Sequence, residues 1–262
     1  MNNTILLVDG HNLLFKAFYG IPARISAKGI PIHGIIGFIG ILKKIITQIQ
    51  PTHLLVVFDS EDNLSRKQDF KDYKANRKSF QDLPADKNPF SQLAGIKTAL
   101  SHLLLVYVEP PGYEADDIIA SYACQFNSNI IIASSDSDFF QLIDNRIKVY
   151  RYHGKKSILF DMDMVLKKYG VQPMQFLDFK SLIGDAADNI CGIRGVGPKT
   201  AVKIINGERA LSLMEEAQFQ RNKVLIRLNS SVVLEKTLCD LQIVKDINNI
   251  KIGEFLQNLQ LI

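Results

Sequence analysis

The chain has 262 residues, of which 47% are hydrophobic and 22% are charged, and its formal net charge is +4 at pH 7. This length and apolar content support a sizeable core in one large or two small globular units, which excludes a disordered tail. No apolar stretch is long enough to span a membrane and the N-terminus lacks a signal-peptide profile, so we expect a cytoplasmic protein, and its mildly basic balance favours a polyanionic partner.

Strand-like and helix-like segments alternate from the N-terminus to about residue 152, as expected of βαβ units. The predicted strands are short runs rich in Ile, Val and Leu, which is typical of parallel strands buried on both faces. In chain order we expect a strand at 5–9, a helix at 34–49, a strand at 53–59, a helix at 91–100, a strand at 103–108, a helix opening near 114, a strand at 129–133, and a strand pair at 146–151 and 156–160.

Residues 61–89 interrupt this alternation with a polar, charged insertion that lacks a sustained apolar stripe. Because little apolar burial opposes the chain entropy there, we expect either a mobile loop or helices held by a partner. A helix in this insertion would direct Lys74 and Arg77 at one phosphate, with Tyr73 available to stack on a base. A solvated charged face is the competing interpretation of such a run.

After residue 152 the pattern is mainly helical, with expected helices through 166, at 177–183 and at 199–205. We therefore predict two domains, an α/β domain at 1–170 that contains the basic insertion and a helical region at 171–262. The α/β domain is expected to have a central, mostly parallel sheet.

Nine acidic residues lie at the ends of separate apolar runs. They are Asp9, Asp59, Glu114, Asp116, Asp117, Asp136, Asp138, Asp185 and Asp188. The carboxyl ends of parallel strands share one crevice, so a folded sheet would bring these carboxylates together. Each pair repels by about 1 kcal/mol at about 4 Å even in bulk water, so the cluster needs cations. Oxygen ligands without interspersed His or Cys favour Mg²⁺ or Mn²⁺ over Zn²⁺.

Each acidic motif has an ordinary explanation when it is taken alone. Acids at 114–117 are favoured at a helix N-terminus, and those at 136–138 and 185–188 fit turns at helix ends. Asp9 and Asp59 also lie at strand ends, so the ordinary explanations of the separate motifs would all have to hold independently of one another. Metal ligation is therefore favoured over them. The acids divide into a first group of Asp9, Asp59, Glu114, Asp116 and Asp117 and a second group of Asp136, Asp138, Asp185 and Asp188. Two divalent ions suit phosphoryl chemistry, in which one activates a water and the other stabilises the leaving oxygen.

A glycine-rich turn at 192–201 opens a predicted helix and presents backbone N–H groups to an anion. It resembles a helix-hairpin-helix element that grips one DNA strand through its phosphates, with Lys199 and Lys203 one helical turn apart. A nucleotide phosphate loop is disfavoured because the spacing is wrong and no strand directly precedes the turn. A plain structural turn is the remaining alternative.

Together these motifs resemble the bacterial and phage 5′-3′ exonuclease and flap endonuclease family, which includes the nuclease domain at the front of DNA polymerase I. The resemblance rests on the segments at 8–10, 58–59, 73–77, 112–117, 136–138, 184–189 and 195–197 and covers nearly the whole chain. It implies a PIN-like (resolvase-like) α/β domain at 1–170, with a basic helical arch at 61–89. It also implies a helical DNA-binding region at 171–262, with its helix-hairpin-helix at 182–206.

The resemblance implies roles for individual residues as well. All nine acids fall on metal-coordinating positions of the family, which implies two Mg²⁺ ions with Mn²⁺ as a substitute, and the hairpin implies a K⁺ ion. Lys74 and Arg77 fall on catalytic basic positions near the scissile phosphate. The implied DNA-binding residues are Lys16, Tyr73, Lys74, Arg77, Gly195, Gly197, Lys199, Thr200 and Lys203.

The implied protein is a metal-dependent, structure-selective 5′ nuclease of DNA replication and repair that cuts DNA at 5′ flaps, nicks or ends. We expect a monomer, either a free-standing nuclease or a separated domain, in functional association with a DNA polymerase. The alternatives are a branched-DNA binding module that does not cut and a PIN-type ribonuclease. Three residues depart from the family pattern: Lys16 where Arg is common, Ser137 where a basic residue is usual, and Cys191 where Pro is usual. Lys16 cannot form the bidentate hydrogen bonds to phosphate that an arginine forms. Ser137 leaves the negative charge of Asp136 and Asp138 less compensated.

Overall fold

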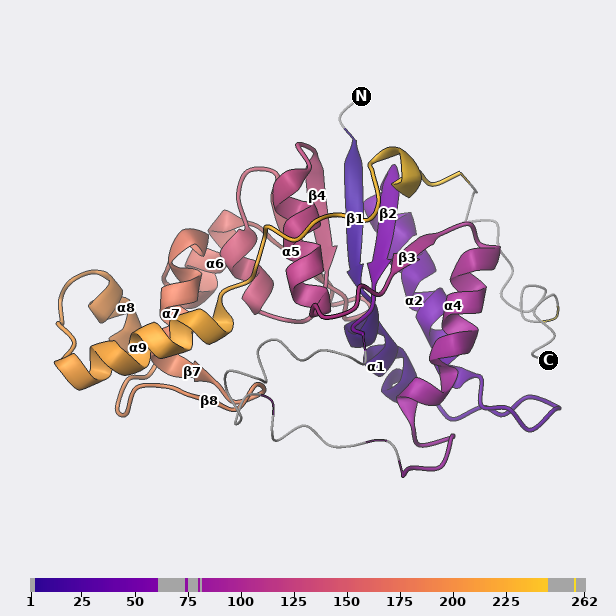
Figure 1. Ribbon diagram of the computed structural model, residues 1–262, viewed down its shortest axis with the longest axis horizontal. Coiled ribbons are helices and arrows are strands. Elements are labelled where there is room, and N and C mark those ends of the chain that lie inside the picture. The colour runs from indigo at the N-terminus through magenta and orange to yellow at the C-terminus, as the bar shows by residue number, and fades with distance from the viewer. Residues whose placement is uncertain (1–2, 61–73, 75–79, 81, 245–256, 258–262) are drawn as a thin grey trace.

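The computed structural model describes residues 3–60, 74, 80, 82–244 and 257 (Figure 1). The elements that build the sheet and its covering helices are β1 (Thr4–Asp9), α1 (Gly10–Gly20), α2 (His33–Ile49), β2 (His53–Val57), α4 (Leu93–His102), β3 (Val106–Val108), α5 (Ala115–Gln125), β4 (Asn129–Ala133), β5 (Ile147–Arg151), β6 (Ile158–Phe160) and α6 (Met162–Tyr169). The remaining elements are α7 (Phe176–Ile183), β7 (Gly184–Asp185), β8 (Ile190–Cys191), α8 (Pro198–Ile205), α9 (Leu213–Ile226) and the short 3₁₀ helices η1 (Pro89–Gln92), η2 (Asp138–Leu142), η3 (Pro173–Gln175) and η4 (Cys239–Leu241).

The central sheet has the strand order β3-β2-β1-β4-β5-β6, and every neighbouring pair is parallel except β5 and β6. The predicted mostly parallel α/β sheet is therefore confirmed. The chain moves outward from β1 in one direction through β2 and in the other through β4. The carboxyl ends of β1 and β4 thus flank a topological switch point, where open α/β sheets bind their ligands.

Each face of the sheet carries its own apolar core, because successive side chains of a strand point to opposite faces. Leu6 and Val8 of β1 pack in one cluster with α1, α2 and α4. Ile5 and Leu7 pack in the other with α5, α6 and α7. Helices cover both faces of the strands in Figure 1, which explains why the strands are continuous apolar runs rather than alternating ones.

One predicted strand was too long. Residues 103–105 do not extend β3 but close the C-terminal turn of α4, where Leu103, Leu104 and Leu105 donate their N–H groups to carbonyls of that helix. Leu104 has a left-handed backbone with φ of 57°, which a strand cannot contain. The apolar run at this point therefore belongs partly to a helix end, which hydrophobic character alone does not distinguish from a strand.

The region after α9 also differs from the mainly helical expectation. Among the described residues of 227–244, η4 is the only helical element. This segment crosses α5 in Figure 1 and reaches the sheet, where Gln242 forms an antiparallel bridge with His53. Gln125 on α5 donates to the carbonyls of Ser230 and Val232 at 3.2 and 2.9 Å. Tertiary hydrogen bonds thus hold a segment that has little helix of its own.

Among the described residues, no helix is both long enough and apolar enough to cross a membrane.

Candidate metal centre

The first group of acids begins at the switch point with Asp9. It is the last residue of β1 and the N-cap of α1, where it accepts the N–H of Asn12 at 3.0 Å. The Ser134 hydroxyl, directly after β4, donates to its other oxygen at 2.8 Å. Burial raises the pKa of Asp9 to about 6, and the charges of Asp59 and Asp136 add to that rise. The carboxylate is therefore buried among like charges, as expected for a site that binds a cation.

Asp59 follows β2 and reaches the N-terminus of α5, where it accepts the N–H of Ala115 at 2.8 Å. His11 Nδ1 lies 2.9 Å from its other oxygen. The imidazole packs edge-on against Phe58 and Phe90, which fixes its orientation. Burial opposes ionisation of Asp59, but the hydrogen bond and charge of His11 prevail and lower its pKa to about 2. Asp59 is thus held as a carboxylate.

The acids at the start of α5 point to different partners. Glu114 is the N-cap residue, and its side chain accepts from Lys74 Nζ at 2.8 Å. Burial and the charges of Asp136 and Asp9 raise the pKa of Asp116 well above its usual range. Asp117 instead accepts the N–H of Asn229 at 2.8 Å. Two of the three acids therefore face the switch point, whereas Asp117 also ties α5 to the segment after α9.

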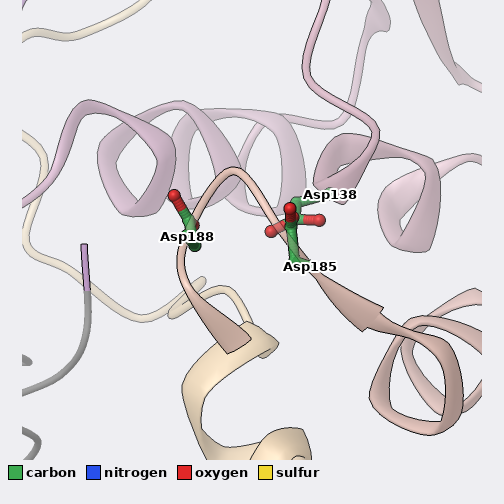
Figure 2. Close-up of side chains that lie close together, drawn as sticks. All are labelled: Asp138, Asp185 and Asp188. Atoms are coloured by element: carbon green, nitrogen blue, oxygen red, sulfur yellow. The ribbon is translucent and has the colours of Figure 1, made fainter. Parts of the chain in front are cut away.

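The second group lies beside β7 and β8. Asp138, Asp185 and Asp188 each offer an oxygen, and these oxygens all lie within 4.8 Å of one another. Asp185 is the last residue of β7, Asp188 lies on the loop between β7 and β8, and Asp138 lies beside Asp185 (Figure 2). This separation suits one metal ion bound by several carboxylates. The charge of Asp136 raises the pKa of both Asp116 and Asp138, so this member of the second group also lies near the first group.

A lysine is part of the second group. Lys180 on α7 is only 6% exposed, and its ammonium donates to both Asp138 and Asp185. These two carboxylates raise the pKa of Lys180 although burial opposes its charge. Lys180 in turn lowers the pKa of Asp185, but burial and Asp136 keep that of Asp138 raised, at about 7. One ammonium therefore compensates only part of the negative charge.

The metal-free protein is expected to lose stability as the pH rises from about 5 to about 7. Asp9, Asp116 and Asp138 have pKa values raised by folding, so the native state binds more protons than the unfolded state over this interval. His53, whose pKa burial lowers, acts in the opposite direction but is a single group. Asp59 and Asp185 have lowered pKa values and affect only more acidic pH.

Urea denaturation in EDTA at several pH values measures this dependence. Saturating Mg²⁺ should reduce the slope, because a bound cation replaces the protons. A free energy of unfolding that rises through this interval without metal would contradict the described arrangement of acids.

The glycine-rich turn joins β8 to α8. Gly195 has φ of 78°, a conformation that glycine adopts without strain, and Gly197 is the N-cap of α8. Pro198 occupies the first helical position, and Lys199 and Lys203 are exposed on the helix that follows. The predicted turn that opens a helix is therefore present, with two lysines one turn apart.

Two family models divide the chain between them. Residues 4–170 match the 5′-3′ exonuclease, N-terminal resolvase-like domain, and residues 171–251 match the 5′-3′ exonuclease, C-terminal SAM fold. The chain belongs to the 5′-3′ exonuclease family. It is a nuclease, as the resemblance of its motifs to that family had predicted.

Relatives agree with this assignment. The 5′-3′ exonuclease of Aquifex aeolicus is 33% identical to this nuclease over 98% of the chain and 92% of the relative. DNA polymerase I of Mycobacterium tuberculosis is 36% identical over 91% of the chain, but the nuclease covers only 27% of that protein. The chain thus spans about a quarter of the length of such polymerase relatives.

Solved structures share the fold at low sequence identity. The T5 D15 protein, co-crystallised with metal ions, superposes with a TM-score of 0.71 at 18% identity, covering 87% of this chain and 90% of its own. Flap endonuclease-1 from Methanococcus jannaschii gives 0.54 at 19% identity, covering 86% of this chain and 78% of its own. The resolvase-like fold with a helical C-terminal region is therefore confirmed.

The basic and aromatic residues predicted to contact DNA differ in how far the structure describes them. Lys74 is 7% exposed and non-helical, with φ of 55°, and its N–H donates to the carbonyl of Asp188 at 3.0 Å. It therefore lies between the two acidic groups. Lys16 donates to the Ser135 hydroxyl at 2.8 Å and to the carbonyl of Tyr152 at 2.5 Å. Tyr73 and Arg77 lie outside the described residues, as does most of the predicted arch at 61–89.

Two residues of the site were not predicted from the sequence, namely His11 and Lys180. His11 lies two residues after Asp9, on the first turn of the helix that Asp9 caps. Lys180 lies five residues before Asp185, in the last turn of a helix that ends at Ile183, so its side chain can reach that acid. Proximity to an acidic motif was the available signal, but isolated His and Lys residues are common near such motifs.

Replacing His11 by Ala is expected to weaken divalent-metal affinity by about 10- to 100-fold, because partners that orient a ligating carboxylate typically have effects of this size. Isothermal titration calorimetry with Mn²⁺ measures this change. His102→Ala, an exposed histidine on α4, is the matched control. Equal affinities in the two variants would show that His11 does not position Asp59 for metal binding.

Proposed function

We propose that this protein is a metal-dependent, structure-selective 5′ nuclease that hydrolyses DNA phosphodiesters at 5′ flaps, nicks or ends. The observation that carries the proposal is the convergence of Asp9, Asp59, Asp116 and Asp136 at the switch point, beside the cluster of Asp138, Asp185 and Asp188. These acids come from five separate segments of the chain and have unfavourably close charges. Bound cations would offset the repulsion between these carboxylates, which explains why the fold brings them together.

The donor set fits hard divalent cations. All the clustered ligands are carboxylate oxygens, and the ammonium of Lys180 already lies between two of them. We propose Mg²⁺, with Mn²⁺ as a substitute and two ions in total. Asp9, Asp59, Glu114, Asp116 and Asp117 would hold one, directly or through water, and Asp136, Asp138, Asp185 and Asp188 the other. When bound, these ions would polarise the phosphate and activate water.

Lys74 and Arg77 are proposed to stabilise negative charge on the phosphate in the transition state. Lys74 supports this role because its ammonium lies 2.8 Å from Glu114 and its backbone contacts Asp188. The lysine is thus already inside the acidic site. A phosphate that enters between the two acidic groups would compete with Glu114 for this ammonium. Tyr73 is proposed to stack on a base nearby.

The turn between β8 and α8 is proposed to hold duplex DNA and to set the cutting position. The backbone N–H groups of Gly195 and Gly197, together with Lys199, Thr200 and Lys203, would contact successive phosphates. A K⁺ ion held by carbonyls of this turn belongs to the same proposal. Lys16, whose ammonium donates a hydrogen bond to the Ser135 hydroxyl, is also proposed to contact DNA.

Residues 1–170 would then perform the chemistry and residues 171–262 would bind duplex DNA. The proposed partner is flapped, nicked or branched DNA, and the T5 flap endonuclease structure with DNA and metal ions supports it at the level of the shared fold. The polymerase relatives support a functional association with a DNA polymerase in replication and repair. We propose a cytoplasmic monomer.

The deciding experiment incubates the protein with a 5′-labelled flap duplex in the presence of Mg²⁺ or EDTA. Cleavage near the flap junction with Mg²⁺ alone is the expected result. A second flap of the same shape with an RNA 5′ strand tests the sugar preference. A folded protein that binds the DNA flap but leaves it intact with either Mg²⁺ or Mn²⁺ would refute the proposal.

A further inference from the structure

A buried asparagine on α9 contacts both ends of the loop that carries Asp185 and Asp188. Asn222 is 2% exposed, and its side-chain amide donates to the carbonyls of Ser181 and Cys191, each at 2.9 Å. Ser181 lies on α7 just before this loop, and Cys191 is the last residue of β8 just after it. Because both partners are carbonyls, only the NH₂ end of the amide can face them. Its two N–H groups are therefore shared between the two sides of the loop.

The two sides of the loop also contact each other directly. β7 pairs with β8 through Gly184 and Cys191, and Ile193 donates its N–H to the carbonyl of Leu182 at 2.9 Å. A Cβ added at Gly184 would lie 2.3 Å from the backbone nitrogen of Gly192, so the backbones approach too closely for a side chain there. The loop is therefore closed at its base, and a group that holds the base sets the position of the whole loop.

A second amide on α9 contacts the same base. Gln218 lies one helical turn before Asn222 and therefore on the same face of α9. Its NH₂ group donates to the carbonyls of Cys191 and Gly192 at 3.1 and 3.0 Å. The last turn of α9 packs on Ile190 of β8, and Figure 1 shows the helix alongside α7 and the two short strands. Hydrogen bonds and apolar contacts from one helix thus hold the base of the loop.

This base joins two parts of the protein with different proposed roles. Asp185 is the last residue of β7, and with Asp188 it lies close to Asp138 in the second group of acids. Gly192, on the other side, begins the glycine-rich turn that is proposed to hold duplex DNA. The distance between metal and turn would decide which phosphodiester is cut. We propose that Asn222 is a positioning residue that fixes the second group relative to the DNA-binding turn, and this rests on the proposed nuclease function.

A simpler role for Asn222 would be to satisfy two buried carbonyls and nothing more. Its removal would then lower the stability of the protein but leave the affinities of each folded molecule unchanged. A positioning role predicts a further effect, because binding groups must be held within about 0.5 Å of their proper geometry. The affinities of the folded protein, rather than its stability, therefore separate the two roles.

Asn222→Ala is the test, with Gln125→Ala as its control. Gln125 also donates to two backbone carbonyls, but these belong to Ser230 and Val232 on the segment after α9. Isothermal titration calorimetry with Mn²⁺ measures the affinity for metal. Anisotropy of a fluorescent flap duplex in EDTA, at several KCl concentrations, measures the affinity for DNA.

Asn222→Ala should weaken Mn²⁺ binding by roughly tenfold at unchanged stoichiometry, because partners that orient ligating carboxylates have effects of this size. It should weaken DNA binding by roughly three- to tenfold and reduce the salt slope by about one, since a displaced turn loses a phosphate contact. Gln125→Ala should change neither affinity beyond about twofold. A partly unfolded sample would instead lower the stoichiometry and leave the dissociation constant for Mn²⁺ unchanged.

A second pair of variants keeps the test decisive if Asn222→Ala does not fold. Gln218→Ala removes the donors to Cys191 and Gly192 from a half-buried side chain, and Gln220→Ala removes an exposed glutamine from the same helix. Gln218→Ala should weaken binding of both Mn²⁺ and DNA, whereas Gln220→Ala should weaken neither.

Wild-type affinities for both ligands in folded Asn222→Ala would overturn the proposal. A change in only one affinity would also overturn it, because the residue would then hold the acids or the turn but not their relative position. Neither measurement requires cleavage. A wild type that binds the flap but never cuts it would therefore refute the nuclease proposal, while the effect of Asn222→Ala on the two affinities would still be judged by itself.

Discussion

Replacing Lys180 by Met is expected to lower the free energy of unfolding of the metal-free protein by about 3–5 kcal/mol at pH 8. Asp138 and Asp185 would then face each other without the ammonium that now bonds to both. Removing one partner of a buried ion pair has this large effect because an uncompensated charge remains buried. The loss should be smaller at about pH 5.5, since Asp138, with a pKa of about 7, can be protonated there.

Urea denaturation of both proteins in EDTA and in Mg²⁺ measures this effect. Mg²⁺ should restore more stability to Lys180→Met than to the wild type, because the cation replaces the missing positive charge. Lys167→Met, which removes an exposed lysine from α6, is the matched control and should change stability by less than about 0.5 kcal/mol. If the two variants were equally stable at pH 8, Lys180 would not be the internal counterion of the second group.

The sheet and most of its covering helices could be predicted because their sequence patterns reflect burial directly. Parallel strands covered on both faces must be continuously apolar, and 129–133 is a case in which the predicted and observed bounds agree. The position of the acids was predictable for a related reason. Asp9 and Asp59 follow such strands, and the carboxyl ends of parallel strands lie at one edge.

What could not be predicted depends on contacts between distant parts of the chain. Asp117 belongs to an acidic motif by sequence, yet it accepts the N–H of Asn229, 112 residues away. Lys180 appears as an ordinary helix residue until the fold brings Asp138 beside it, 42 residues away. Local periodicity contains no information about such pairs, because the separation in sequence is bridged only by the tertiary fold.

The positive groups of the site also explain how so many acids can be tolerated in a folded protein. His11 contacts Asp59 and Lys180 contacts Asp185, and each contact lowers the pKa of its acid. Lys74 forms an ion pair with Glu114. These groups are side chains of the protein, so they are present before any metal or DNA arrives. Asp59 and Asp185 therefore remain ionised and able to bind metal, whereas Asp9, Asp116 and Asp138, whose pKa values are raised, need the metal itself.

Asp116→Asn is therefore expected to reduce flap cleavage by about 10³-fold or more, because a metal-binding carboxylate contributes several kcal/mol of transition-state stabilisation. The substitution keeps the shape of the side chain and removes only its charge. Binding of the flap duplex in EDTA should be unchanged or slightly tighter, since a negative charge near the phosphate is lost. Single-turnover cleavage and anisotropy measure the two quantities on the same DNA.

The stability of this variant distinguishes a loss of chemistry from a loss of folding. Asp116 lies near Asp9, Asp136 and Asp59, so neutralising it relieves repulsion and should raise the free energy of unfolding in EDTA by on the order of 1 kcal/mol. A variant that is inactive yet more stable cannot have lost activity by unfolding. Asp163→Asn, an exposed acid in the first turn of α6, is the control and should cleave like the wild type. Wild-type cleavage by Asp116→Asn would remove this residue from the metal centre, and the first group would then have to bind metal through Asp9, Asp59, Glu114 and Asp117 alone.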